Sequence, residues 1–152
     1  NRIEFSNTQL NVNLPDSGFE FEPPEGAEPL SVTPVQPGEE SWKVVRDLAG
    51  DTSQLEALLD TGTTRYDDID LEISSRAMET YSYATDEYGS LAGETRWTRH
   101  FKRGDWEVYT ITRTLLTSDE TTFRIRADLD AYEGPSRVYS RSWDKTIPRR
   151  LV

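Results

Sequence analysis

The stretch Phe123-Arg124-Ile125-Arg126-Ala127-Asp128-Leu129-Asp130-Ala131 decides the fold. Apolar and charged residues alternate strictly along it. In a β-strand, this alternation places all the apolar side chains on one face and all the charged ones on the other. The pattern is typical of a half-buried antiparallel strand that has one face on a core and one in water. It therefore predicts a sheet with two unlike faces.

Similar alternation continues on both sides of this strand, within residues 91–152. Turn-like breaks separate the segments at residues 102–105, 118–121 and 133–136, and Gly104 can supply a positive φ in the first of them. Four two-faced segments at hairpin spacing predict an antiparallel β-meander. We expect its core to contain Trp97, Trp106, Val108, Phe123, Ile125, Leu129 and Val138.

Earlier residues predict further strands. The segments 1–14, 42–48 and 77–84 are strand candidates. Residues 53–60 fit either a helix or the second strand of a hairpin, and the Thr-Gly-Thr sequence at 61–63 should end that segment. These strands should help to close a sandwich or half-barrel.

Proline shapes the region before residue 40. Five prolines fall within residues 19–38, and proline fixes φ and lacks a backbone donor, so this region should be an extended linker or edge segment. We therefore expect residues 1–40 to form a strand plus a Pro/Glu-rich extended linker, and residues 41–152 to form an antiparallel β domain. The predicted fold class is mainly β: an antiparallel meander forming a sandwich or half-barrel, with an N-terminal extended Pro/Glu-rich segment.

Composition excludes several classes of function. The 152-residue chain has no cysteine, which excludes disulfide scaffolds, thiolate metal sites and cysteine nucleophiles. Its net charge of −11 should repel nucleic acid and anionic membranes, so we expect no nucleic-acid partner. No stretch approaches the roughly 20 apolar residues that span a bilayer. We expect no membrane span and a soluble protein; the compartment stays open, with the cytoplasm slightly favoured.

The chain carries no recognisable catalytic triad. It has no G-x-S-x-G frame for a nucleophile, and its single histidine, His100, lies in a predicted strand without a matched nucleophile and acid. We therefore predict no catalytic residue in this chain. Whether the chain is part of an enzyme stays open.

Three other patterns have simpler explanations than a binding site. Asp67, Asp68, Asp70 and Glu72 could supply calcium ligands, but they alternate with apolar residues as on the wet face of a strand. Arg103-Gly104-Asp105 matches a tripeptide read by adhesion receptors, and a hairpin already explains it. Aromatic side chains could stack on sugars, but they are also ordinary strand residues. We predict no metal site, no cofactor-binding residue and no cofactor.

The C-terminal motifs carry a family resemblance. Gly104-Asp105-Trp106, Leu129-Asp130-Ala131-Tyr132-Glu133-Gly134 and the tail from Trp143 through Ile147-Pro148-Arg149-Arg150-Leu151-Val152 resemble the C-terminal region of CocE/NonD family hydrolases. This is the cocaine-esterase and Xaa-Pro dipeptidyl-peptidase-like group. Arg150 stands where the family pattern has an aspartate.

The resemblance implies a serine hydrolase that cleaves an ester, amide or Xaa-Pro peptide bond in a separate α/β-hydrolase domain. No position here matches the nucleophile motif of the family. We therefore expect a non-catalytic C-terminal β domain, with the catalytic domain of the same parent protein as its partner and a homo-oligomer as a further option. The chain has no initiator methionine, which agrees with a piece of a longer protein.

Two alternatives stay open. The run Phe19-Glu20-Phe21-Glu22-Pro23-Pro24-Glu25-Gly26-Ala27 is similar to a segment near the end of LolA-like lipoprotein carrier proteins, which bind acyl chains in a half-barrel. This similarity implies a binding module for lipid or another apolar ligand. The second alternative is a purely structural or interaction β domain.

Overall fold

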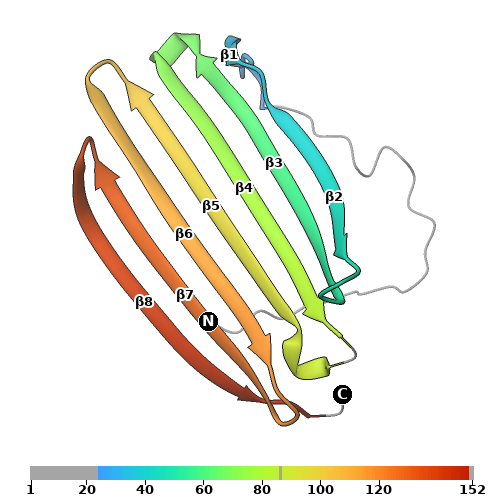
Figure 1. Ribbon diagram of the computed structural model, residues 1–152. Coiled ribbons are helices and arrows are strands. Elements are labelled where there is room, and N and C mark those ends of the chain that lie inside the picture. The colour runs from blue at the N-terminus through green and yellow to red at the C-terminus, as the bar shows by residue number, and fades with distance from the viewer. Residues whose placement is uncertain (1–23, 86, 151–152) are drawn as a thin grey trace, which may run out of the picture.

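The computed structural model describes residues 24–85 and 87–150, and in this part of the chain eight strands form one antiparallel sheet (Figure 1). Two single-turn 3-10 helices, η2 (Asp67–Ile69) and η3 (Tyr88–Ser90), lie in the connections. The strands are β1 (Val32–Gln36), β2 (Glu39–Asp47), β3 (Thr52–Tyr66), β4 (Leu71–Ala84), β5 (Ala92–Arg103), β6 (Trp106–Ser118), β7 (Thr122–Glu133) and β8 (Ser136–Pro148).

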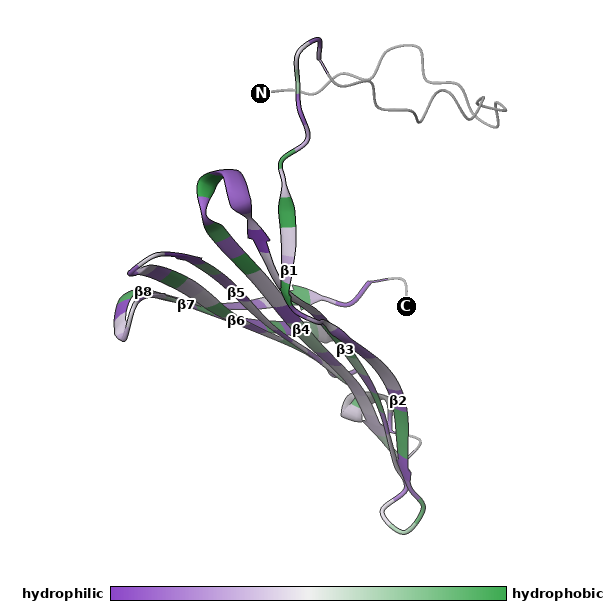
Figure 2. Ribbon diagram, turned by 90° about the horizontal axis from the view of Figure 1, so that it is seen from above, coloured by the Kyte–Doolittle hydropathy of each residue, from purple (hydrophilic) through white to green (hydrophobic). Residues whose placement is uncertain are grey.

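From β3 to β8 each strand pairs with the next one in the sequence. At the other edge, β1 and β2 both pair with β3, one beyond the other along its length. The prediction of a mainly β, antiparallel fold is confirmed, and the sheet is bent and twisted without closing into a barrel (Figure 2). No helix within the described ranges has the length and the apolar run that a bilayer crossing requires. The strand predicted within residues 1–14 lies outside the described residues.

Gly62 allows β3 to pair with two strands. Its φ is +67°, and a Cβ placed there would lie 2.2 Å from the backbone oxygen of Gln36. The β3–β4 register shifts between Asp60 and Thr63, as at a β-bulge. The prediction that residues 61–63 end the segment is therefore wrong: β3 continues through them with a bulge.

Segment 53–60, which fits either a helix or a strand by sequence, is a strand because it pairs on both sides. It lies inside β3, between β2 and β4, so its backbone groups bond to neighbouring strands and not within a helix. The proline-rich region also contributes a strand, β1, in which Pro34 occupies an edge position that tolerates the missing donor. The hairpin predicted at Gly104 is confirmed, because Gly104 and Asp105 form a two-residue loop and Gly104 has a φ of +57°.

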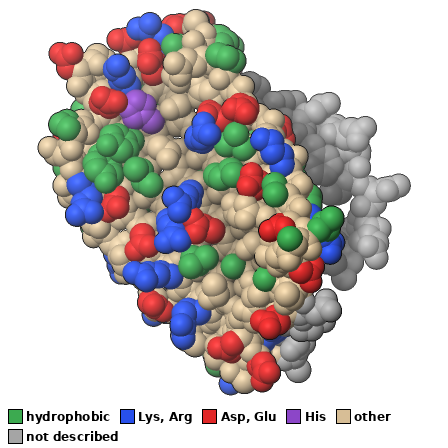
Figure 3. Space-filling model, viewed as in Figure 1, with side chains coloured by type: hydrophobic (Ala, Val, Ile, Leu, Met, Phe, Trp, Pro, Cys, Tyr) green, Lys and Arg blue, Asp and Glu red, His purple; other side chains and the backbone are tan. Residues whose placement is uncertain are grey.

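The two faces of the sheet differ in chemistry. Register places all four tryptophans on one face, here called the tryptophan face. The opposite face, here called the charged face, carries ion pairs and the single histidine, and it is turned to the viewer in Figure 3. Three successive rows cross the tryptophan face from β2 to β8: Val44, Leu55, Tyr81, Gly93, Leu116, Ile125, Lys145; then Trp42, Ala57, Glu79, Thr95, Thr114, Ala127, Trp143; then Glu40, Leu59, Ala77, Trp97, Thr112, Leu129, Arg141.

The predicted core is only partly confirmed. Six of its seven members lie on the tryptophan face, as alternation indicates, but Val138 falls at a β7–β8 register shift and is 60% exposed. None of the seven is fully buried. Ala77 is the only buried hydrophobic residue in the described part of the chain, because no second layer of described residues covers this face. The expectation of a buried core is therefore wrong, although the expected face is right.

A charge network crosses the middle of the charged face. Arg96 and Arg113 lie directly opposite each other on β5 and β6, where two like charges would repel. Glu94 accepts hydrogen bonds from both, with 2.6 Å to Nη2 of Arg113. The bond from Arg113, followed by that from Arg96, lowers the pKa of Glu94 to about 2.

The Glu94→Gln variant should be less stable by about 1 kcal/mol at pH 7, because Glu94 is largely covered but its arginine partners are about half exposed. The folded pKa lies below the ordinary value of 4.5, so this stabilisation is complete above that value and is lost as the pH falls through about 2. Urea unfolding at pH 7 and pH 3 measures the difference, which should shrink at pH 3. The exposed turn variant Glu120→Gln is the control, and equal losses in the two variants would contradict this role for Glu94.

Candidate ligand-binding face

Small side chains lie between large ones on the tryptophan face. In the second row, Trp42 on β2 and Trp143 on β8 stand at the two ends. Between them lie Glu79 and four small residues, Ala57, Thr95, Thr114 and Ala127. The middle of this row therefore carries little side-chain bulk compared with its two ends.

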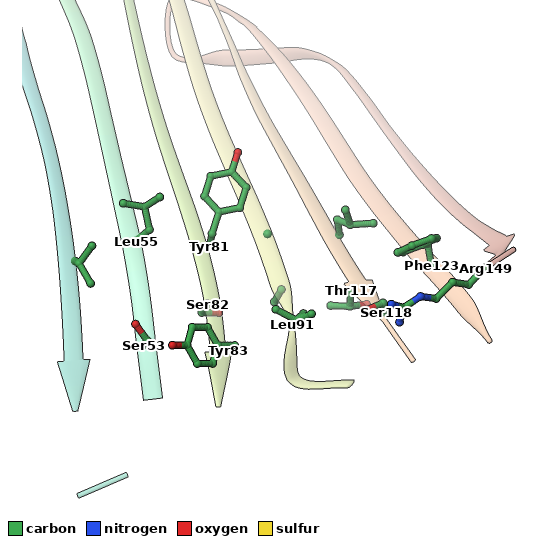
Figure 4. A pocket seen from close by; sticks show the side chains of 14 residues that line it. Ser53, Leu55, Tyr81, Ser82, Tyr83, Leu91, Thr117, Ser118, Phe123 and Arg149 are labelled. Atoms are coloured by element: carbon green, nitrogen blue, oxygen red, sulfur yellow. The ribbon is translucent and has the colours of Figure 1, made fainter. Parts of the chain in front are cut away.

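A hollow of about 440 Å³ lies at one end of this face (Figure 4). Its volume falls within the roughly 300–1,000 Å³ of small-molecule sites. The apolar lining residues are contributed by six successive strands, from β2 to β7, and by the segment before β5. They include Val44, Leu55, Tyr81, Leu91, Leu116 and Phe123. The hollow is open to solvent, since Tyr81 and Leu116 are 48% and 41% exposed.

Gly93 forms part of the floor of the hollow, directly opposite Tyr81 in the register. A Cβ at this position would lie 3.3 Å from Cδ1 of the Tyr81 ring, so the ring lies over the space that a larger residue would fill. The hydroxyl of Tyr81 donates to Oε2 of Glu79 at 2.8 Å. This hydrogen bond raises the pKa of Tyr81 and holds the ring in place.

Arg149 forms the rim of the hollow and is the only charged residue among those that line it within the described part of the chain. Its backbone N–H donates to the oxygen of Thr121 at 2.7 Å, and its Nη1 donates to the backbone oxygen of Asp119 at 3.3 Å. The guanidinium carbon lies 5.4 Å from the centre of the Phe123 ring. Within the described ranges, its Nε is enclosed and has no hydrogen-bond partner.

Asp119 fixes the turn that holds Arg149. Its carboxylate accepts bonds from the backbone N–H groups of Thr121 and Thr122, at 2.9 Å and 2.7 Å, and from both hydroxyls. The bond from the Thr121 backbone, then those from Thr122, lower the pKa of Asp119 to about 2. The carboxylate of Asp119, whose backbone oxygen Arg149 contacts, is therefore occupied by the turn itself.

His100 has an acidic partner but is not part of a catalytic triad among the described residues. Its Nε2 is 2.7 Å from Oε1 of Glu107, and its ring is tilted against Tyr109, which stacks on Tyr132 at 4.6 Å. In the residues that the structure describes, no serine or threonine hydroxyl bonds to this imidazole. The histidine and its acid are therefore present without a nucleophile.

The acidic cluster adopts a different structure from the one expected. Asp67 and Asp68 lie in the η2 turn between β3 and β4, so the prediction that they occupy the wet face of a strand is wrong. They accept bonds from Ser31 and Thr33, while Asp70 pairs with Arg65. These carboxylates tie the start of β1 to the turn, and no group of acidic and histidine residues suited to a metal occurs within the described ranges.

The hollow itself was not predicted from the sequence. Its members extend along the chain from Val44 to Arg149, and only the register brings Tyr81, Gly93 and Leu116 into one row. The alternation around Tyr81 and Tyr83 indicates that both side chains lie on the same face of the sheet. Nothing in the local sequence indicates that Gly93, on the next strand, lies opposite Tyr81. Arg149 appeared only as part of the tail motif.

Comparisons with family models, with curated proteins and with solved structures gave no match to this chain. The resemblances to CocE/NonD hydrolases and to LolA-like carriers thus rest on their motifs alone and stay predictions. Part of each motif, residues 19–23 and 151–152, lies outside the described residues.

An uncovered tryptophan face predicts quenchable tryptophan fluorescence. Trp42 and Trp106 are 70% and 45% exposed, so acrylamide should quench the native emission nearly as strongly as that of the urea-unfolded chain. Stern–Volmer titrations of the two states measure this, and the Trp42→Phe variant should lose more of the quenchable signal than Trp97→Phe. Strong protection of all four tryptophans would show that this face is covered in solution.

Proposed function

We propose that this chain is a binding module for an apolar ligand with a long hydrocarbon chain, held in the hollow on the tryptophan face. The observation that carries the proposal is the lining of that hollow. Leu55, Leu116 and Phe123 present hydrocarbon walls to solvent in a chain with a net charge of −11. Exposed apolar patches of this kind mark binding sites, because their contact with water is unfavourable.

The shape of the site also supports this proposal. Its walls are held on paired strands, so the hollow exists before a ligand arrives and little ordering entropy is lost on binding. Gly93 has no side chain to raise the floor of the hollow, and the ring of Tyr81 lies over it. The similarity of residues 19–27 to LolA-like carriers points to the same class of ligand, an acyl chain.

A second candidate is an accessory domain that packs on the catalytic part of a CocE/NonD-type hydrolase. Exposed apolar residues outside the hollow favour this candidate. Trp42 and Trp106 do not line the hollow, so a ligand in it would leave them exposed. In that role the tryptophan face would meet another domain. Ligand binding by the isolated chain separates the two candidates, because a packing surface need not bind small apolar molecules with a fixed stoichiometry.

Titration with the neutral fluorescent probe N-phenyl-1-naphthylamine tests the proposal. The chain should enhance the probe emission saturably, with one probe per chain. The Gly93→Leu variant should bind at least about tenfold more weakly, a loss of about 1.4 kcal/mol, because the new side chain and the Tyr81 ring that it displaces take up room in the hollow.

The matched control is Thr98→Leu, which adds an apolar side chain to the charged face of the same strand and should keep the affinity of the parent chain. Urea unfolding checks that both variants remain folded. If Gly93→Leu does not fold, Leu116→Ser removes part of the wall and should weaken binding in its place. Absence of saturable binding, or equal binding by Gly93→Leu and the parent, would contradict the proposal.

A further inference from the structure

We propose that the ligand of this hollow is a single-chain amphiphile with a carboxylate head, such as a fatty-acid anion, and that Arg149 binds the head. This inference rests on the proposed apolar site and adds the chemistry of the ligand and its direction. The tail extends from Arg149 across the sheet toward Val44.

The charge distribution points to an anionic head. The chain carries a net charge of −11, yet no acidic side chain lines the hollow and its one charged lining residue is a cation, within the described residues. Lys145 lies on the same face, at the β8 end of the row that contains Tyr81 and Leu116. The charged groups that the hollow and its row present near β8 are therefore cations, which favours a carboxylate over a neutral or cationic group.

The partners of Arg149 leave it available for such a head. Among the described residues its side chain makes one hydrogen bond, to the backbone oxygen of Asp119, and no salt bridge. A guanidinium carries five N–H donors in a planar fork that matches a carboxylate. The carboxylate of Asp119 is engaged by Thr121 and Thr122, so it does not compete for the arginine. The ring of Phe123 supports the guanidinium from one side.

The lining gives the site an elongated form. From Phe123 on β7 to Val44 on β2 the hollow crosses five spacings between neighbouring strands, about 24 Å at about 4.8 Å each. Along this path Leu116, Gly93, Tyr81 and Leu55 occupy successive strands of one row, and serine and threonine side chains complete the lining. A largely apolar path about five strand spacings long that begins at a cation fits a hydrocarbon tail better than a compact ring system.

Three amphiphiles with the same tail test the inference by displacement of N-phenyl-1-naphthylamine. They are laurate, 1-dodecanol and dodecyltrimethylammonium, each used below its micelle concentration. Laurate should displace the probe at a concentration at least about tenfold lower than dodecanol. Dodecyltrimethylammonium should be the weakest of the three.

The Arg149→Gln variant should lose the preference for laurate over dodecanol, because the carboxylate head loses its cation. Arg149→Lys should keep part of the preference because it keeps the charge. The matched control Arg141→Gln removes a cation from the tryptophan face away from the hollow, where Arg141 lies over Trp143, and should behave as the parent chain.

The outcomes separate the two proposals. Equal displacement by all three amphiphiles with normal probe binding would overturn the carboxylate inference and leave the apolar site standing. Equal loss of the laurate preference in Arg149→Gln and Arg141→Gln would also overturn it. The preference would then come from the overall charge of the tryptophan face and not from a contact with Arg149. Absence of probe binding by the parent chain would instead overturn the proposed function itself.

Discussion

The rest of this structure depends on one constraint, the register in which each strand from β3 to β8 is hydrogen-bonded to the next. Side chains in a strand alternate with a period of two, so a slip by one residue would exchange the two faces. Such a slip on β5 would turn Trp97 toward the ion pairs and Arg96 toward the hydrocarbon walls. The large number of paired residues in these long strands makes that exchange costly, because each slipped strand would place charge on the apolar side and tryptophan among carboxylates. The sheet therefore keeps two unlike faces without a second layer to enforce them.

Much of this fold could be predicted from alternation alone, and the reasons for the exceptions are physical. The pattern at Phe123 to Ala131 correctly indicates an antiparallel strand with an apolar side. The pattern cannot indicate what covers that side, because a strand whose apolar face packs on a core and a strand whose apolar face is left open show the same alternation. The bulge at Gly62 was missed because a glycine that ends a strand and one that bends it look alike locally. The hollow could not be predicted, since the distance between Gly93 and Tyr81 depends on pairing between strands.

The distribution of charge on the two faces gives the sheet a division of roles. On the charged face, acids and bases are paired with one another, as Glu94 is with its two arginines, and they stabilise the sheet. On the tryptophan face, three cations lie against aromatic rings: Arg99 over Trp97, Arg141 over Trp143 and Arg149 over Phe123. A cation held by a ring keeps donors that a carboxylate partner would occupy. The proposals made for the hollow depend on this difference between paired and ring-supported charges.

The outer strand β8 has a consequence for how the molecule meets others of its kind. It ends the sheet, so half of its backbone donors and acceptors face outward in the described structure. Charged side chains such as Arg141, Asp144 and Lys145 flank this open ladder, and Pro148 closes it. Charges and prolines along an edge discourage the addition of another strand. The strand that borders the tryptophan face on this side therefore also limits edge-to-edge pairing with a strand of another molecule.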